Sequence, residues 1–92
     1  MTPGVSDLTE VKRPIREKVI ALAARQNVDV RALHDSDVIL ESGALDSVAL
    51  LELIMWIELT FDVTIRQTDL TVEKLGSIDA IAVYLLSRTA DS

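Results

Sequence analysis

The sequence contains no cysteine and a single histidine, His34. The absence of cysteine excludes a disulfide framework, a thiol nucleophile and a cysteine-based metal site, and one histidine cannot form a cluster of histidine ligands. No apolar run approaches the roughly 18 residues that a membrane-spanning helix needs. The first residues, which include Pro3, Gly4 and Asp7, lack the charged start and apolar run of a secretory signal. We therefore expect a soluble cytoplasmic protein with no bound metal.

Size and charge narrow the possible functions further. The 92 residues suffice for one small domain, and a hydrophobic content of 49% argues against disorder. The net charge is −6. Residues 1–34 hold six Lys/Arg and four Asp/Glu, which gives +2, whereas residues 35–92 hold three Lys/Arg and eleven Asp/Glu, which gives −8. An acidic body repels phosphate backbones, so we expect protein partners and no nucleic acid.

A first helix is predicted from apolar residues that recur at spacings of three and four. The residues of this stripe are Leu8, Val11, Ile15, Val19 and Leu22. Proline is tolerated in the first turn of a helix and destabilises its interior. We therefore expect the helix to begin near Arg13–Pro14, after a lead-in over residues 8–12, and to end near Gln26–Asn27. Residues 1–7 show no such period and are expected to form a flexible tail.

A long connection, residues 28–46, follows the first helix. A structureless loop of this length is rare in a compact domain, so we expect its apolar segment, residues 38–40, to hold it against the core. Gly43 is predicted to lie in a tight turn or to adopt a positive φ.

The second predicted helix, Ser47–Thr60, is apolar almost all round, with Glu52 and Glu58 as its only charged residues. A helix in a domain of this size cannot bury every face. Either this helix is central, or part of its apolar surface binds a partner.

The rest of the chain completes an all-α fold. An extended stretch, Phe61–Ile65, should insert its apolar side chains into the core, and Thr68–Leu70 should form one short helical turn. Ser77 is a suitable cap for a last helix. The apolar residues of that helix are Ile78, Ile81, Ala82, Leu85 and Leu86. The sequence thus predicts a small four-helix bundle, three longer helices and one short helix, over residues 8–88, with a flexible C-terminus at 89–92.

Asp46 and Ser47 lie where the long connection enters the second helix. Both residue types are favoured helix caps, so a purely structural role explains the pair by itself. The wider sequence is more specific: GALDSV at 43–48 is followed by LELIM at 51–55, a Glu58-x-x-Phe61-x-x-x-Ile65 pattern and LGSI at 75–78. Over residues 35–88 this resembles the phosphopantetheine-dependent acyl, peptidyl and aminoacyl carrier proteins, which have a Gly…Asp-Ser-Leu site. The first helix matches only by pattern.

The resemblance implies a specific chemistry. A separate transferase moves 4′-phosphopantetheine from coenzyme A to the family serine, here Ser47, and the thiol of the arm carries a cargo as a thioester. Asp46 is expected to cap the helix and to contact a basic residue or the metal site of the transferase. Further implied partners are an adenylating or acyltransferase loading enzyme and a downstream transferase or synthase, with the chain itself a monomer. The sequence shows no base–nucleophile pair, so we expect a carrier and not an enzyme.

Some positions depart from the family pattern. Val48 replaces the usual leucine, and Arg66 stands where many relatives have proline. Gly43 lies four residues before Ser47, a spacing that resembles discrete carriers of D-alanylation and of nonribosomal peptide or polyketide pathways. We therefore expect a stand-alone carrier of that type. A fatty-acid-type carrier and an unmodified carrier-like interaction module are the alternatives.

Partners are expected to dock on the helix that begins at Ser47, through apolar contacts more than through charge. The residues assigned to this face are Val48, Glu52, Met55, Trp56 and Leu59. Leu51 shares their spacing but is expected to be part of the core, and Trp56 is expected to be partly exposed. A deep selective pocket is not expected in so small a bundle.

Side chains elsewhere are assigned plain structural roles. Tyr84 should be a core residue with its hydroxyl outward, and His34 should be a solvated loop residue. The basic cluster of Lys12, Arg13, Arg16 and Lys18 should form a solvated helix face.

Overall fold

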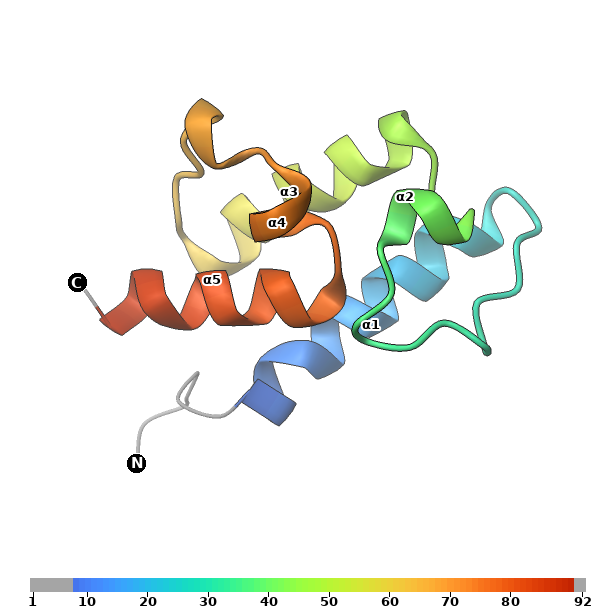
Figure 1. Ribbon diagram of the computed structural model, residues 1–92, viewed down its shortest axis with the longest axis horizontal. Coiled ribbons are helices and arrows are strands. Elements are labelled where there is room, and N and C mark those ends of the chain that lie inside the picture. The colour runs from blue at the N-terminus through green and yellow to red at the C-terminus, as the bar shows by residue number, and fades with distance from the viewer. Residues whose placement is uncertain (1–7, 91–92) are drawn as a thin grey trace.

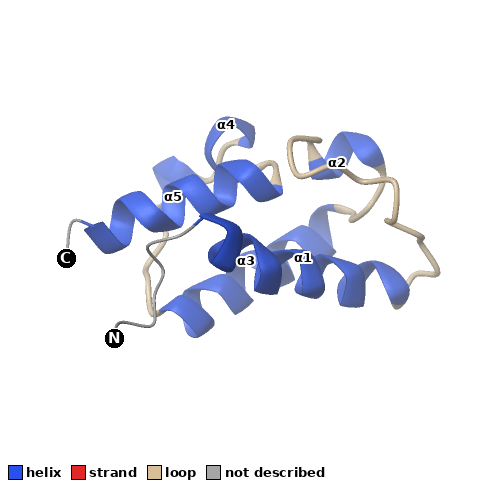
Figure 2. Cartoon of the chain, turned by 90° about the horizontal axis from the view of Figure 1, so that it is seen from below, coloured by secondary structure: helices blue, strands red, loops and turns tan. Residues whose placement is uncertain are grey.

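The computed structural model describes residues 8–90, and these residues form helices and loops without a strand (Figures 1 and 2). Three helices are long: α1 (Leu8–Ala24), α3 (Ser47–Phe61) and α5 (Ile78–Ala90). Two helices of one turn, α2 (Ile39–Ser42) and α4 (Val72–Leu75), and a 3₁₀ turn, η1 (Gln67–Asp69), lie between them. The predicted small all-α bundle is confirmed. The short turn predicted at Thr68–Leu70 corresponds to η1, and α2 and α4 are short helices that the sequence did not predict. The predicted tail at residues 1–7 lies outside the described residues.

The first helix begins earlier than predicted, because α1 starts at Leu8 and contains Pro14 within it. Proline at this position removes one backbone hydrogen bond and costs roughly 3 kcal/mol in a helix interior. The side chains on either side of it, Val11 and Ile15, are both fully buried. Their burial, at roughly 1.5–3 kcal/mol for each side chain, offsets the cost of the proline and keeps the lead-in residues helical.

The core lies where α1 packs against both α3 and α5, with α4 against α5 (Figure 2). The predicted stripe of α1 is buried from Val11 onward, whereas Leu8 at its end is exposed. The largest fully buried side chains are Ile15, Ile39, Leu45, Leu53, Ile57, Ile78, Ile81 and Leu85. As predicted, Ser77 caps α5, because its hydroxyl oxygen accepts a hydrogen bond from the Ala80 N–H at 3.0 Å.

The connection between α1 and α3 is held at several points. Ile39 is fully buried, and its N–H donates to the Gly76 carbonyl oxygen at 2.8 Å, which joins α2 to the residue that ends α4. The N–H of Asp79 donates to the Asp35 carbonyl oxygen at 2.9 Å. The expectation that the apolar segment pins this loop is therefore confirmed for Ile39, whereas Leu40 beside it is exposed.

The basic cluster on α1 is not simply a solvated face. Lys12 Nζ lies 2.9 Å from an oxygen of Asp79 and 3.3 Å from one of Asp35. Arg16 donates to the Asp35 carboxylate at 2.7 Å and to the Leu33 carbonyl oxygen at 2.8 Å. The positive first third of the chain thus pairs with the acidic remainder, and these contacts fix the connection on α1 and α5.

No helix in the described part of the chain has both the length and the apolar character that a membrane span requires.

Candidate functional site

Ser47 is the first residue of α3, and Asp46 is its cap. The backbone of Asp46 is extended, with φ −88° and ψ −178°, and its Oδ1 accepts a hydrogen bond from the Ala49 N–H at 2.8 Å. Asp46 therefore takes the capping role that either residue could have filled. The side chain of Ser47 is exposed, and its hydroxyl makes no hydrogen bond to another described residue. Helix capping therefore explains Asp46, whereas it does not explain why a serine follows at position 47.

The approach to Ser47 is fixed by a tight turn. Gly43 ends α2 with φ 81°, the left-handed conformation that was predicted for it. The Ser42 hydroxyl donates to the Ile39 carbonyl oxygen at 2.7 Å and accepts from the Ala44 N–H at 3.1 Å. Ala44 and the following Leu45 are buried. The chain thus enters α3 from an anchored loop, which fixes the position of the Ser47 backbone.

A second contact orients the carboxylate of Asp46. Its Oδ2 accepts a hydrogen bond from Gln26 Nε2 at 3.2 Å. The hydrogen bond from the Ala49 N–H, with that of Gln26 second, lowers the pKa of Asp46 below its usual value. A carboxylate beside Ser47 is therefore kept ionised. Gln26 was not predicted as part of the site, because nothing in the local sequence places the end of one helix beside the start of the next.

The start of α3 suits an esterified phosphate. The first backbone N–H groups of a helix lack partners within the helix, and the helix dipole is positive at this end. The first turn contains no acidic residue, and the cap occupies one of its N–H groups. A phosphodiester on Ser47 Oγ would therefore meet favourable dipoles. The exposed hydroxyl and the helix start together fit the attachment of a phosphopantetheine group.

An apolar groove of about 290 Å³ runs from Ser47 between α3 and the segments that carry α2 and α4. Its walls include Leu50 and Ile54 of α3 and Val72 and Leu75 of α4. The sequence predicted no deep selective pocket, and it did not predict this open groove either. One wall comes from the segments that carry the one-turn helices α2 and α4, which have no readable period in the sequence.

One strip of α3 exposes its apolar side chains. Val48, Met55 and Leu59 are 68%, 61% and 84% exposed, so the sequence correctly placed these three on an accessible face. Leu51 is 54% exposed, and its expected place in the core was wrong. The core contacts of α3 are made instead by Ala49, Leu53, Ile54 and Ile57. The strip, defined as Val48, Leu51, Met55 and Leu59, leads away from Ser47 along α3.

The other two residues assigned to the partner face lie beside this strip. Glu52 accepts hydrogen bonds from Arg25 at 2.9 and 2.8 Å. Trp56 is partly exposed, as predicted, and packs edge-to-face on Phe61 with ring centroids 6.0 Å apart. The ammonium group of Lys18 lies 5.9 Å from the centroid of the Trp56 ring. Trp56 therefore links α3 to α1, and its contacts are mainly packing contacts within the protein.

Comparison with known protein families agrees with this geometry. A family model described as a phosphopantetheine attachment site matches residues 17–85, which include the end of α1, the groove and the Asp46–Ser47 pair. Comparisons with curated proteins and with solved structures gave no match. Members of the matched family carry a covalent 4′-phosphopantetheine group. Since the match covers most of the chain, this protein belongs to the phosphopantetheine-binding carrier family.

Proposed function

We propose that Ser47 is the attachment residue and that the protein is a stand-alone carrier of acyl or aminoacyl thioesters. The observation that carries this proposal is the exposed hydroxyl of Ser47 at the start of α3. It makes no hydrogen bond to a residue that the structure describes, and its neighbour Asp46 already caps the helix. In the transfer step, Ser47 Oγ forms a bond to the pantetheine-side phosphorus of coenzyme A. The pyrophosphate bond breaks, adenosine 3′,5′-bisphosphate leaves, and a base of the transferase takes the serine proton. When bound, the arm supplies the thiol that forms the thioester.

The residues around Ser47 are proposed to serve binding and not catalysis. Asp46 presents an ionised carboxylate to a basic residue or metal ion of the transferase, and the Gln26 contact keeps this carboxylate in position. The free N–H groups of the first turn of α3 stabilise the phosphodiester once it has formed. Members of this family typically act as carriers and not as catalysts. We propose the same role here, with loading and transfer performed by partner enzymes.

The pathway is proposed from the sequence around the site. The spacing of Gly43 before Asp46–Ser47 and the low acidity of α3 favour a discrete carrier of a nonribosomal peptide or polyketide type. The apolar groove that starts at Ser47 favours the alternative, a fatty-acid-type carrier, since it could shelter an apolar cargo. The proposed location for either type is the cytoplasm.

Mass spectrometry after incubation with coenzyme A and a promiscuous phosphopantetheinyl transferase tests the assignment. The protein should gain the mass of one phosphopantetheine, and Ser47→Ala should gain none while circular dichroism shows an unchanged helical fold. Thr60→Ala, which removes an exposed hydroxyl near the other end of α3, is the matched control and should be modified. Modification that persists in Ser47→Ala would assign the arm to another residue. A protein that is never modified would instead be an interaction module.

A further inference from the structure

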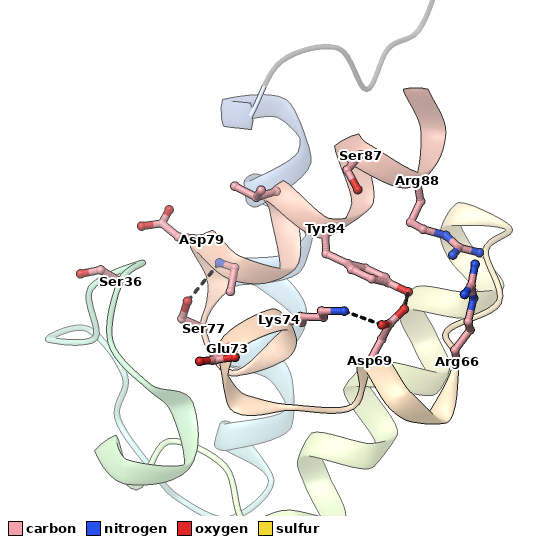
Figure 3. Close-up of a pocket in the computed structure, with 12 residues that line it drawn as sticks. Ser36, Arg66, Asp69, Glu73, Lys74, Ser77, Asp79, Tyr84, Ser87 and Arg88 are labelled. Atoms are coloured by element: carbon pink, nitrogen blue, oxygen red, sulfur yellow. Dashed lines mark hydrogen bonds and ion pairs between the residues drawn. The ribbon is translucent and has the colours of Figure 1, made fainter. Parts of the chain in front are cut away.

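A second hollow lies on the side of α4 away from the groove, between η1, α4 and α5, and has a volume of about 730 Å³ (Figure 3). Most of the residues that line it have polar or charged side chains. Residues 35–92 contain only three basic residues, Arg66, Lys74 and Arg88, and all three line this hollow. In a segment with eleven acidic residues, the gathering of every cation at one place calls for an explanation.

Each oxygen of the Asp69 carboxylate, which lines the hollow, already accepts a hydrogen bond. Lys74 Nζ lies 2.7 Å from Oδ1, and the Tyr84 hydroxyl donates to Oδ2 at 2.8 Å. The expectation that this hydroxyl points outward was therefore wrong. The hydrogen bond from Lys74 is the main reason that the pKa of Asp69 lies below its usual value. Lys74 is therefore the cation that pairs directly with Asp69, and Arg66 adds only a weaker charge interaction with the same carboxylate.

The other two basic residues of the hollow are Arg66 and Arg88. Their guanidinium groups point toward one another (Figure 3). Among the residues that the structure describes, neither arginine makes an ion pair. Arg88 is held in place, because it donates to the Thr64 carbonyl oxygen at 3.2 Å and lies 5.9 Å from the centroid of the Tyr84 ring. Two cations directed at each other repel, and an anion between them removes that repulsion.

The two other acidic residues that line the hollow do not supply this anion. Asp79 lies 2.9 Å from Lys12 and is paired with it. Glu73 lies at the opposite end of the hollow, beside Ser77, away from the two arginines (Figure 3).

We propose that Arg66 and Arg88 form a binding site for an oxyanion, a carboxylate or phosphate group, held between the two guanidinium groups. The planar fork of arginine donors matches both groups and binds them with two parallel hydrogen bonds. The anion comes either from an acidic segment of a partner protein or from free phosphate. The site contains none of the residues around Ser47, so it does not depend on the prosthetic arm. It also gives a role to Arg66, which stands where the carrier family often has proline.

The test follows the side-chain Nε–Hε signals of arginine in ¹⁵N-labelled protein. Inorganic phosphate and an acetylated glutamate-rich peptide are titrated separately at constant ionic strength, into both the wild type and Ser47→Ala. The signals of Arg66 and Arg88 should shift together and saturate, equally in both proteins. Arg66→Gln should weaken binding by about tenfold, which corresponds to the loss of one charge-assisted contact. Arg13→Gln is the matched control, because Arg13 is exposed on α1, and it should change nothing.

The outcomes separate the two sources of the anion. Tighter binding of the peptide than of phosphate indicates an acidic segment of a partner, and the reverse order indicates free phosphate. Small, linear shifts of equal size at Arg13, Arg66 and Arg88 for both probes would mean general charge screening and would overturn the proposal.

Discussion

Gln26 donates a hydrogen bond to Asp46 across 3.2 Å, and this contact connects the turn after α1 to the residue that caps α3. The same carboxylate uses its other oxygen to accept from the Ala49 N–H at 2.8 Å. Asp46 is therefore held from two sides, which fixes both the start of α3 and the direction of the charge beside Ser47. Asp46 therefore stabilises the start of α3, and suitable substitutions can separate this role from the proposed role in recognition.

Substitutions of Asp46 should distinguish the role of its side chain as a helix cap from the role of its negative charge. Asp46→Asn keeps an acceptor for the Ala49 N–H, so we expect little change in the free energy of unfolding, whereas Asp46→Ala should lose roughly 1 kcal/mol. If the charge contacts the transferase, Asp46→Asn should be modified much more slowly than the wild type while remaining folded. Urea unfolding and the initial rate of phosphopantetheine transfer measure the two effects. Modification of Asp46→Asn at the wild-type rate would leave only the capping role.

Gly43 should tolerate asparagine better than alanine. Its φ of 81° is strained for a residue with a Cβ, although a Cβ at this position would meet no atom within 4 Å. The cost of Gly43→Ala is therefore one of backbone conformation, roughly 1–2 kcal/mol. Asparagine adopts this conformation more readily, so Gly43→Asn should cost less. Thermal or urea unfolding of the two variants checks the order, and equal stability of both with the wild type would contradict it.

The sequence predicted those parts of the fold that have a long run of apolar residues or a residue that caps a helix locally. The extent of α3 follows from its apolar run and from Asp46, and the cap of α5 follows from Ser77. By contrast, α2 has a single turn, and its cap residue Val38 makes no side-chain hydrogen bond. It is fixed by the hydrogen bond from Ile39 to Gly76, which no local pattern reveals.

The exposure of individual side chains was harder to predict. Because α3 is apolar on nearly every face, its sequence has no stripe that separates core from surface, and Leu51 was misplaced for that reason. The hydroxyl of Tyr84 bonds to Asp69, a residue of η1, and only the packing of α5 on that turn brings the two together. Ser47 could be proposed from the sequence because its pattern is local, whereas Gln26 could not.

Acid should weaken the attachment of the long connection to α1. Hydrogen bonds from Arg16, with Lys12 as a further partner, lower the pKa of Asp35 below its usual value. A carboxyl with a lowered pKa in the folded state contributes stability above its unfolded pKa, near 3.9, and loses this contribution as pH falls through the folded pKa. Asp35→Asn should therefore be less stable than the wild type at pH 7, and the difference should shrink below about pH 4.

The matched control for this experiment is Asp62→Asn. Asp62 is exposed at the end of α3 with φ 55°, a conformation that asparagine also accepts, and it makes no ion pair with another described residue. Its stability should follow that of the wild type from pH 7 to pH 3 in urea unfolding. A constant difference between Asp35→Asn and the wild type over this range would show that the charge of Asp35 has no part in holding the connection.

The exposed strip of α3 should bind partners through apolar contacts. Met55→Ala and Leu59→Ala remove side chains that are 61% and 84% exposed, so the fold should be retained. Anchors of this kind often lose about 2 kcal/mol of binding free energy on truncation, or roughly thirtyfold in affinity. Trp56→Ala is less suitable than either, because it also removes the contacts with Phe61 and Lys18 and should lower stability.

The KM for the phosphopantetheinyl transferase, measured at several salt concentrations, provides the readout, with Ile20→Ala as control. Ile20 is 45% exposed on α1, outside the strip, and its truncation should leave KM unchanged. Apolar recognition predicts a weak dependence on ionic strength, since salt screens charge contacts and leaves buried apolar area unaffected. Of the acidic residues near the strip, Glu58 accepts from the Ile65 N–H at 2.9 Å and serves the fold. Steep salt dependence with unchanged KM in Met55→Ala and Leu59→Ala would therefore move recognition to Glu41 and Glu52.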